Sequence, residues 1–372
     1  MNVNKQKNNL VRLGDYIEVY DVKNVGSKNL PFYGINKDKT FMPTVADTNE
    51  LDSSKYKIVE KDVFVFSGMQ TGRDVCIRLA LYEKDEPILV SPAYTTFIIK
   101  DKSEILPQYL FIQFNRFQMD RYGWFVSDGS IRSNLDWNVF CDIQIPLPSI
   151  ETQRELVATY NGLKALAEQN EALIQPLTEA CQAYIVDCKK KYPEVELGEY
   201  IEFYYEKNKD CQITLEQGIN IEKIFINPHR PNSDLSSRII VRKGQFAYCT
   251  QLNNENVAIA YRTEEDCVVS PVYKAFEIKQ QHKNILLPEY LFLWLKRKEF
   301  GRYVYWRSVG SAYEFLQEEN IREYKIPIPP IPVQQAIVNL YNCAEEAKNI
   351  ANEAREKMKT LCPALVQKAL HS

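Results

Sequence analysis

The strongest constraint on the fold is an internal duplication of the 372-residue chain. Five short segments occur twice in the same order, and each second copy follows its first by 179 to 184 residues. The pairs are LGDYIE (13–18) with LGEYIE (197–202), GIN (34–36) with GIN (218–220), VSPAY (90–94) with VSPVY (269–273), LPQYLF (106–111) with LPEYLF (287–292), and IPLPSIETQ (145–153) with IPIPPIPVQ (326–334). Self-similarity at a fixed spacing is the signature of a repeated structural unit. We therefore expect two similar halves.

Each half begins with segments typical of a domain that mixes helices and strands. Residues 62–67, 75–82 and 88–99 are rich in β-branched and aromatic residues, which favours strands. Residues 104–118 follow with apolar side chains at helical spacing. The second half repeats this order. The sequence therefore predicts an α+β fold with two pseudo-repeated mixed α/β domains.

A long helix is expected at the end of each half, because apolar residues recur there every seven positions, as in coiled coils. The first predicted seam is Leu156, Leu163, Asn170 and Leu177, with a second stripe at Leu166, Leu173 and Ala180. The other seam is Ile337, Ala344, Ala351 and Met358, with a second stripe at Leu340, Ala347, Ala354 and Leu361. Helices from a duplicated chain with two-fold symmetry would pair as an antiparallel coiled coil.

One asparagine and two prolines in the predicted helices modify this prediction. Asn170 lies in a seam, where one polar residue usually fixes the register. Pro176 and Pro363 are expected to kink or break their helices, because proline lacks the amide hydrogen. Apolar side chains beyond the needs of two helices predict that further helices pack on the pair: Tyr160, Ala167, Ile174 and Tyr341.

These patterns divide the chain into four parts, at residues 1–150, 151–191, 192–332 and 333–372. The net charge of −3 argues neither for nor against nucleic acid, because binding depends on local patches. The polar N-terminus and the lack of a long apolar run predict a cytoplasmic protein without membrane contact. Nine cysteines at isolated positions and three histidines predict reduced thiols and no metal site.

With these motifs laid out, the chain from Leu13 onward resembles the specificity (S) subunit of type I restriction-modification enzymes. The paired LG(D/E)YIE, VSP(A/V)Y and LP(Q/E)YLF segments carry the resemblance, and the proline-rich entry to a heptad helix is its most specific element. The resemblance implies two target recognition domains that each read one half of a split sequence in double-stranded DNA. It also implies conserved helical regions that dock two adenine methyltransferase subunits, whereas the sequence leaves open whether restriction subunits join.

A non-catalytic subunit of this family needs no cofactor in its own chain. S-adenosylmethionine is expected in the methyltransferase partner, and ATP and Mg in a restriction subunit. One alternative is a free-standing adenine methyltransferase, since SPAY (91–94) is similar to that class's base-gripping tetrapeptide. The chain lacks a glycine-rich loop for the cofactor, and both copies of the motif favour a turn before a strand. A DNA-binding scaffold protein without a methylase partner stays open as the second alternative.

DNA-reading residues are expected on loops, where the two copies differ most. Bases are read by polar and basic side chains, and phosphates are held by basic ones. The candidates in the first copy are Lys37, Lys39, Gln70, Arg73, Ser130, Arg132 and Asn134. The candidates in the second copy are Lys223, Gln251, Asn253, Asn254, Arg307, Ser308 and Ser311. No catalytic residue is predicted.

Overall fold

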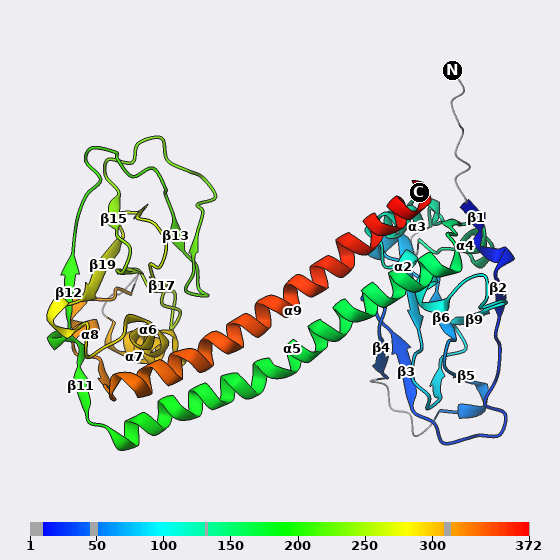
Figure 1. Ribbon diagram of the computed structural model, residues 1–372, viewed down its shortest axis with the longest axis horizontal. Helices are drawn as coiled ribbons and strands as arrows, with labels where there is room; N and C mark the ends of the chain where they lie inside the picture. Colours follow the sequence, from blue (N-terminus) through cyan, green and yellow to red (C-terminus); the bar gives the residue numbers. More distant parts are fainter. Residues whose placement is uncertain (1–9, 45–50, 131–132, 309–313, 372) are drawn as a thin grey trace. The chain divides into compact units, whose positions relative to one another are not determined.

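The computed structural model describes residues 10–44, 51–130, 133–308 and 314–371, with side chains described as far as residue 360. Its contacts divide the chain into two compact units, shown in Figure 1. The first unit is Met1–Glu171 with Asn349–Ser372, and the second is Ala172–Lys348. Within the described residues, no helix is long and apolar enough to cross a membrane.

The domain of the first unit is built on two four-stranded sheets. One sheet is antiparallel in the order β2-β9-β6-β7, and the other has the order β4-β3-β8-β5 with β3 parallel to β8. Its elements are β1 (Leu10–Arg12), η1 (Leu13–Asp15), β2 (Ile17–Val19), β3 (Phe32–Ile35), β4 (Phe41–Pro43), η2 (Ser53–Lys55), β5 (Lys57–Val59), β6 (Phe64–Ser67), α1 (Thr71–Asp74), β7 (Arg78–Leu81), β8 (Ile88–Val90), β9 (Thr95–Ile99), α2 (Pro107–Phe114), α3 (Phe117–Val126), α4 (Trp137–Cys141) and β10 (Gln144–Pro146).

The domain of the second unit repeats the first of these sheets and divides the second into two smaller ones. Its four-stranded sheet has the order β12-β19-β16-β17, and two-stranded sheets pair β13 with β14 and β15 with β18. Its elements are β11 (Glu194–Glu196), η3 (Leu197–Glu199), β12 (Ile201–Tyr204), β13 (Gly218–Ile219), β14 (Phe225–Ile226), β15 (Ile239–Val241), β16 (Phe246–Cys249), β17 (Ile259–Tyr261), β18 (Cys267–Val269), β19 (Tyr273–Ile278), η4 (Gln280–His282), α6 (Pro288–Lys296), α7 (Lys298–Arg307), α8 (Glu318–Arg322) and β20 (Lys325–Pro327).

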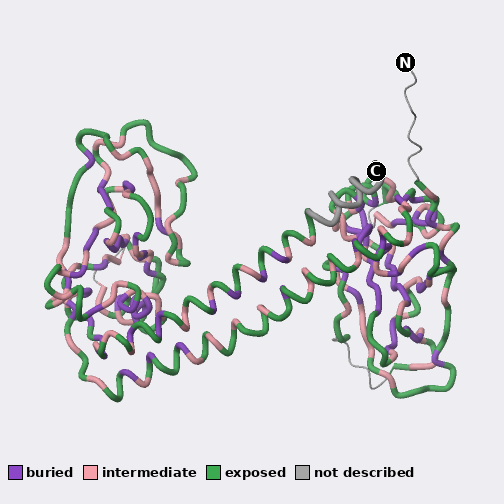
Figure 2. Tube along the Cα trace, in the orientation of Figure 1, coloured by how far each residue is buried: buried purple, intermediate pink, exposed green. Residues whose placement is uncertain are grey.

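Equivalent contacts in the two cores show that the duplication extends to side-chain packing. In the first core the rings of Phe64 and Phe97 stack with centroids 4.8 Å apart, and in the second Phe246 and Phe276 stack at 4.9 Å. In both domains the first strand pairs with the last, as β1 with β10 and β11 with β20. Figure 2 shows the buried residues gathered inside each domain. The predicted α+β fold with two pseudo-repeated domains is confirmed.

The helix predicted at residues 104–118 is two helices. α2 ends at Phe114, and α3 begins at Phe117 after Arg116, whose backbone is extended. Arg297 is extended at the equivalent place between α6 and α7. α2 is buried on most of its surface, whereas α3 is mostly exposed, so the chain must change direction between them. Helical periodicity alone does not reveal such a break.

The VSPAY and VSPVY segments form turns between strands, as predicted. The Tyr94 amide donates to the Ser91 carbonyl at 3.1 Å, and the Tyr273 amide donates to the Ser270 carbonyl at 3.0 Å. Both tyrosine rings pack against the small cores beside them. The similarity to a methyltransferase motif therefore has a structural explanation.

Two long helices follow the domains, α5 (Ile150–Lys191) and α9 (Ile331–His371). The first unit holds the start of α5 and the end of α9, and the second unit holds the other two parts, so the helices run in opposite directions. α5 continues through Pro176, so the predicted break is wrong there. Pro176 and Ala172 are both exposed, so the Ala172 carbonyl that loses its backbone partner at the proline is open to solvent. The surroundings of Pro363 and Leu361 lie outside the described side chains.

The buried face of α5 differs in part from the predicted one. Leu156 is buried, and the other predicted seam residues on α5 are half-buried. The second inward stripe comes four residues after the first and not three, at Tyr160, Ala167, Ile174 and Cys181. Leu166 and Leu173 are exposed. A seven-residue repeat fits either stripe, so the sequence period alone does not decide between them.

The inward face of α9 follows the predicted pattern more closely. Among the predicted positions, Ile337, Ala344, Ala347, Ala351 and Ala354 are buried, and Leu340 and Met358 are half-buried. Small alanine side chains allow two helices to approach closely. In the second unit the Cys181 thiol lies 3.7 Å from the Ile337 carbonyl oxygen, which brings α5 and α9 into contact there.

Asn170 has a local partner rather than one across the seam. Its side-chain amide donates to the Leu166 carbonyl of its own helix at 2.8 Å. The cross-helix polar contact in the first unit is a two-pronged ion pair from Arg355 to Glu171, with nitrogen–oxygen distances of 2.8 and 3.0 Å. This contact, one residue from Asn170, supplies the register-specific pairing expected of the asparagine.

A buried glutamine joins each domain to the start of its long helix. The side chain of Gln153 accepts from the Leu106 amide at 2.9 Å and donates to the carbonyls of Glu104 and Pro148 at 2.9 and 3.0 Å. Gln334 makes the same three bonds in the second copy, at 2.7 to 2.8 Å. Both glutamines are fully buried, so these bonds fix the direction in which each helix leaves its domain.

The predicted domain boundaries stay predictions, because the contact division cuts each long helix near its middle. The eight described cysteines are unpaired thiols, and most of them are buried. No group of three or more potential metal ligands occurs among the residues that the structure describes.

Candidate nucleic-acid interface

The two loops predicted to read DNA in the first copy lie against each other. The Leu135 amide donates to the Gly68 carbonyl at 2.8 Å, and the Gly72 amide donates to the Ser133 carbonyl at 2.9 Å. These bonds join the turn after β6 to the segment that follows α3. The fold thus brings together two loops that are separated by more than fifty residues in sequence.

Most candidate side chains of this pair are positioned by contacts within it. The Arg73 guanidinium donates to the Gln70 side chain at 2.7 Å and to Asp74 at 3.0 Å, and it stays largely exposed. Ser130 donates to Asp128 at 2.6 Å. The side chain of Asn134 accepts from the Gln70 amide at 3.2 Å, so Asn134 supports the loop. Arg132 lies outside the described residues.

The second copy pairs its loops in a similar way. Gln251 forms an antiparallel bridge with Phe315, so the loop after β16 lies beside the segment that leads into α8. Gln251, Asn253 and Asn254 are exposed, and Asn254 has a left-handed backbone with φ of 54°. Three exposed amide side chains offer both donors and acceptors to base edges.

The remaining described candidates of the second copy form contacts within their own domain. Arg307 forms an ion pair with Glu323 and stacks over Trp306 at 5.7 Å. The Ser308 hydroxyl donates to the Tyr305 carbonyl at 2.7 Å and closes the last turn of α7. Ser311 lies outside the described residues.

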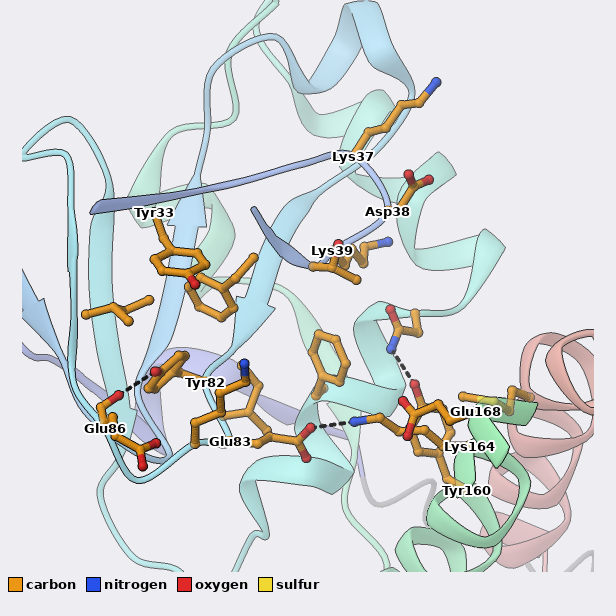
Figure 3. Close-up of a pocket in the computed structure, with 18 of the residues that line it drawn as sticks. Tyr33, Lys37, Asp38, Lys39, Tyr82, Glu83, Glu86, Tyr160, Lys164 and Glu168 are labelled. Carbon is orange, nitrogen blue, oxygen red and sulfur yellow. Dashed lines mark hydrogen bonds and ion pairs between the residues drawn. The ribbon is translucent and has the colours of Figure 1, made fainter. Parts of the chain in front are cut away.

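The three predicted phosphate-binding lysines have different environments. Lys37 is exposed and points away from the domain, as Figure 3 shows. Lys39 is buried and pairs with Asp120, with nitrogen–oxygen distances of 2.7 and 2.8 Å. Lys223 is half-buried and donates to the Leu295 carbonyl. Because Lys39 and Lys223 turn inward to these partners, they are poorly placed for phosphate, and we remove both from the interface.

A groove of about 1180 Å³ lies in the first unit, between the sheet of the domain and the two helices (Figure 3). Several of its lining cations form ion pairs, among them Lys164 with Glu83 at 2.7 Å and Arg355 with Glu171. The Asn115 side chain also donates to the Tyr160 hydroxyl across it, at 3.4 Å. The ion pairs neutralise part of the positive charge that lines the groove.

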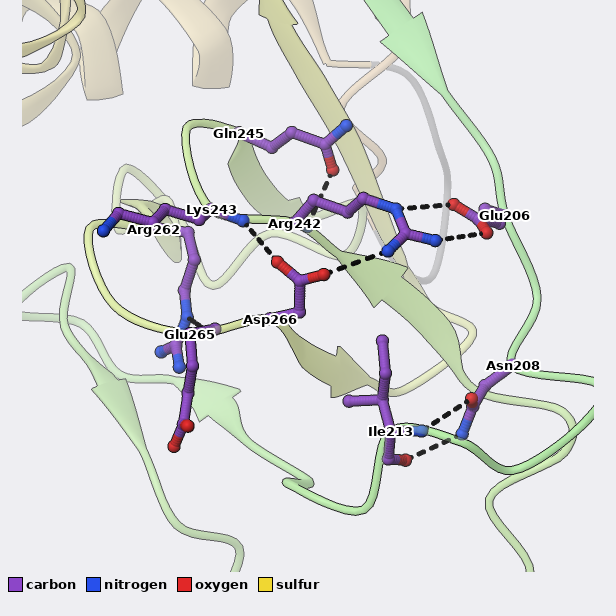
Figure 4. A network of polar contacts seen from close by, with 9 residues as sticks. All are labelled: Glu206, Asn208, Ile213, Arg242, Lys243, Gln245, Arg262, Glu265 and Asp266. Atoms are coloured by element: carbon purple, nitrogen blue, oxygen red, sulfur yellow. Dashed lines mark hydrogen bonds and ion pairs between the residues drawn. The ribbon is translucent and has the colours of Figure 1, made fainter.

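In the second domain, the basic side chain of Arg242 is part of a polar network and forms ion pairs with two acidic residues (Figure 4). Arg242 contacts Glu206 through two nitrogens at 2.6 and 3.1 Å and Asp266 through a third at 2.9 Å. The Asp266 carboxylate also accepts from the Lys243 amide at 2.8 Å. Arg242 therefore ties together three connecting segments rather than offering a free charge.

The prediction from loop polarity missed a set of exposed aromatic residues. Phe125 is 78% exposed at the end of α3, and Trp306 is 74% exposed at the end of α7. Their neighbours Trp124 and Tyr305 are also exposed. Trp306 follows Phe125 by 181 residues, and Tyr305 follows Trp124 by the same number. The spacing of the internal repeat could therefore have identified these aromatic positions from the sequence.

Comparisons with known proteins bear on this arrangement. Residues 189–341 match the family model described as the type I restriction modification DNA specificity domain. The second half of the chain is therefore similar to the DNA specificity domain of type I restriction-modification systems. The internal repeat relates the first half of the chain to this matched segment.

Two known proteins are similar to this chain over most of its length. A protein of Methanocaldococcus jannaschii described as "Putative type I restriction enzyme MjaX specificity subunit" is 19% identical over 355 residues, covering 86% of this chain and 80% of the relative. The crystal structure of the type I restriction-modification system S subunit from M. genitalium superposes with a TM-score of 0.62 at 12% identity, covering 99% and 98% of the two chains. At this identity the second likeness concerns the fold.

The contact between the two loops of the first copy gives a first prediction. A side chain at Gly68 would place its Cβ 2.1 Å from the Leu135 carbonyl oxygen, which is backbone and cannot give way cheaply. We expect Gly68→Ala to cost about 1–3 kcal/mol and to part the loops. Gly129→Ala is the matched control, because its Cβ would meet nothing within 4 Å. Hydrogen exchange at the Leu135 amide measures the effect, and equal protection in both variants would contradict it.

Proposed function

We propose that the chain reads a split target in double-stranded DNA, with one half-site for each recognition domain. The observation that carries the proposal is the contrast within the repeat. The two domains share the strand order of the main sheet, the stacked core rings and the helix attachment, whereas the paired loops carry Gln70 and Arg73 in one copy and Gln251, Asn253 and Asn254 in the other. A common scaffold with different polar loops suits two different base sequences.

We further propose that the two long helices dock two adenine methyltransferase subunits. Leu166, Leu173 and Tyr184 are exposed on α5, and apolar side chains on a helix that already has a partner suggest another protein surface. S-adenosylmethionine would then be bound by those partners, and ATP and Mg by a restriction subunit if one joins. The chain would act in the cytoplasm, where it meets DNA. The length of the helix pair would set the number of unread base pairs between the half-sites.

The test is single-molecule sequencing of DNA from cells that contain the methyltransferase partner, with and without this chain. We expect a split motif with N6-methyladenine on both strands only when the chain is present. Replacement of residues 13–150 by the same domain of another specificity subunit should change one half of that motif and leave the other. A change in both halves, or in neither, would contradict the modular reading.

A stable complex with the methyltransferase that produces no new methylation would favour the second candidate. In that case the chain is a DNA-binding scaffold protein, and its paired loops would still be the DNA contact.

A further inference from the structure

The last turns of α3 and α7 present aromatic rings to solvent in a repeated arrangement. The equivalent segments are Arg121–Ser127 and Arg302–Ser308, which share an arginine, a serine and three aromatic positions. In the first copy the rings of Tyr122 and Phe125 lie 6.4 Å apart, and in the second those of Tyr303 and Trp306 lie 6.2 Å apart. The same local geometry therefore occurs in both domains.

Each of these helices leads directly into a candidate DNA-reading segment. The Ser127 hydroxyl donates to the Gly123 carbonyl at 2.7 Å, and the residues after it form the loop that packs on Gly68. Ser308 closes α7 with a bond of the same length. The exposed rings are thus attached to the interface by a fixed helical turn.

Leaving these large apolar rings in contact with water is unfavourable, and the fold of the domain does not require it. Single exposed apolar residues are normal, but here two large rings are exposed at equivalent positions of two domains that differ in neighbouring loops. Arginines also recur beside them, at Arg121 and Arg302. A feature that both domains keep while their loops differ suits a requirement common to both half-sites and independent of base sequence.

We propose that Phe125 and Trp306 are equivalent aromatic DNA contacts, one in each recognition domain, that stack against bases beside those read by the loops. Aromatic stacking tolerates any base because every base has a π face. Apolar side chains also insert between base steps of duplex DNA and partly unstack them. This inference rests on the proposed function and assigns to it a contact that does not depend on sequence.

The experiment measures binding of the full chain, with its methyltransferase partner, to a random-sequence 40-base-pair duplex over a series of salt concentrations. We expect Phe125→Ala and Trp306→Ala each to weaken binding roughly 10-fold. Phe125→Trp and Trp306→Phe should stay within about twofold of the wild type, because stacking is retained. The dependence of affinity on salt should keep its slope, since no phosphate contact is lost.

Tyr205→Ala is the matched control, because Tyr205 is an exposed aromatic residue between β12 and β13. Its affinity should equal that of the wild type. If the wild type does not bind DNA, the proposed function fails. If the wild type binds and both alanine variants bind equally well, the inference alone is overturned. Loss of the methyltransferase from the variants would assign the rings to the partner and would also overturn it.

Discussion

Lys39→Met is expected to destabilise the first domain by about 3–5 kcal/mol, because it leaves the Asp120 carboxylate buried without its cation. The side chains of Lys39 and Asp120 are 5% and 15% exposed, and their nitrogen–oxygen distance is 2.7 Å. One oxygen of Asp120 also accepts from the Ile77 amide at 3.0 Å. The carboxylate cannot turn toward water without breaking that bond, so its charge stays in the domain.

Replacement of the equivalent lysine of the second domain, Lys223, is expected to have the opposite effect on stability. The position of Asp120 is taken by Gly301, where a Cβ would lie 2.3 Å from the Glu255 carbonyl oxygen. Lys223 is therefore left with the Leu295 carbonyl and the face of Phe300, 5.9 Å away. Burial, with a smaller contribution from Lys296, lowers the pKa of Lys223 to about 8.

The sign of the pH dependence follows from this lowered pKa. Between about pH 8 and the ordinary lysine value near pH 10.4, the unfolded chain holds a proton that the folded chain has lost. The stability contribution of Lys223 therefore rises with pH across this window and is least favourable below pH 8. Lys223→Met should stabilise the second domain at pH 7, and the gain should shrink as the pH approaches 10.

Hydrogen exchange of peptides from β6 and β9, and of those from β16 and β19, measures the two domains separately. This separation is needed because a chain with two units does not guarantee a single unfolding transition. The pair of variants is its own control, since each replaces an equivalent lysine by the same residue. Equal losses of protection in both domains at pH 7 would contradict the assignment of the charges.

Gln153→Ala is expected to cost roughly 3 kcal/mol or more, since it leaves one buried amide and two buried carbonyls without their partner. Gln334→Ala should have the same effect in the second copy. A local measurement is exchange at the amides of Leu106 and Leu287, which donate to the two glutamines. Each variant should expose its own amide and leave the other protected.

Gln175→Ala provides the control for the glutamine variants. Gln175 lies exposed on α5 and contacts Glu179 of the same helix at 2.8 Å, so we expect a change within about 0.5 kcal/mol. A loss of stability in Gln175→Ala that matches the loss in Gln153→Ala would show that any glutamine on the helix has this effect. The buried attachment would then not be the cause.

Several features follow from the sequence because they depend on local or repeated patterns. The five repeated segments predicted two similar domains, and the heptads predicted the two long helices that the structure contains. Strands such as β6 and β9 lie inside the predicted apolar segments, since alternating and β-branched residues favour extended chain in any context.

Tertiary structure decided what local patterns leave open. A seven-residue period fits two inward faces, and in the folded chain the face with Ala167 and Cys181 is buried, with Cys181 against Ile337 of α9. A lysine beside a repeated turn is as suitable for an ion pair as for a phosphate, and Asp120, brought from 81 residues away, decided the environment of Lys39. The sequence by itself determined the two domains and two helices, through repetition and periodicity. Which side chains face inward, and which charges are neutralised, depended on contacts between distant residues, which only the folded chain creates.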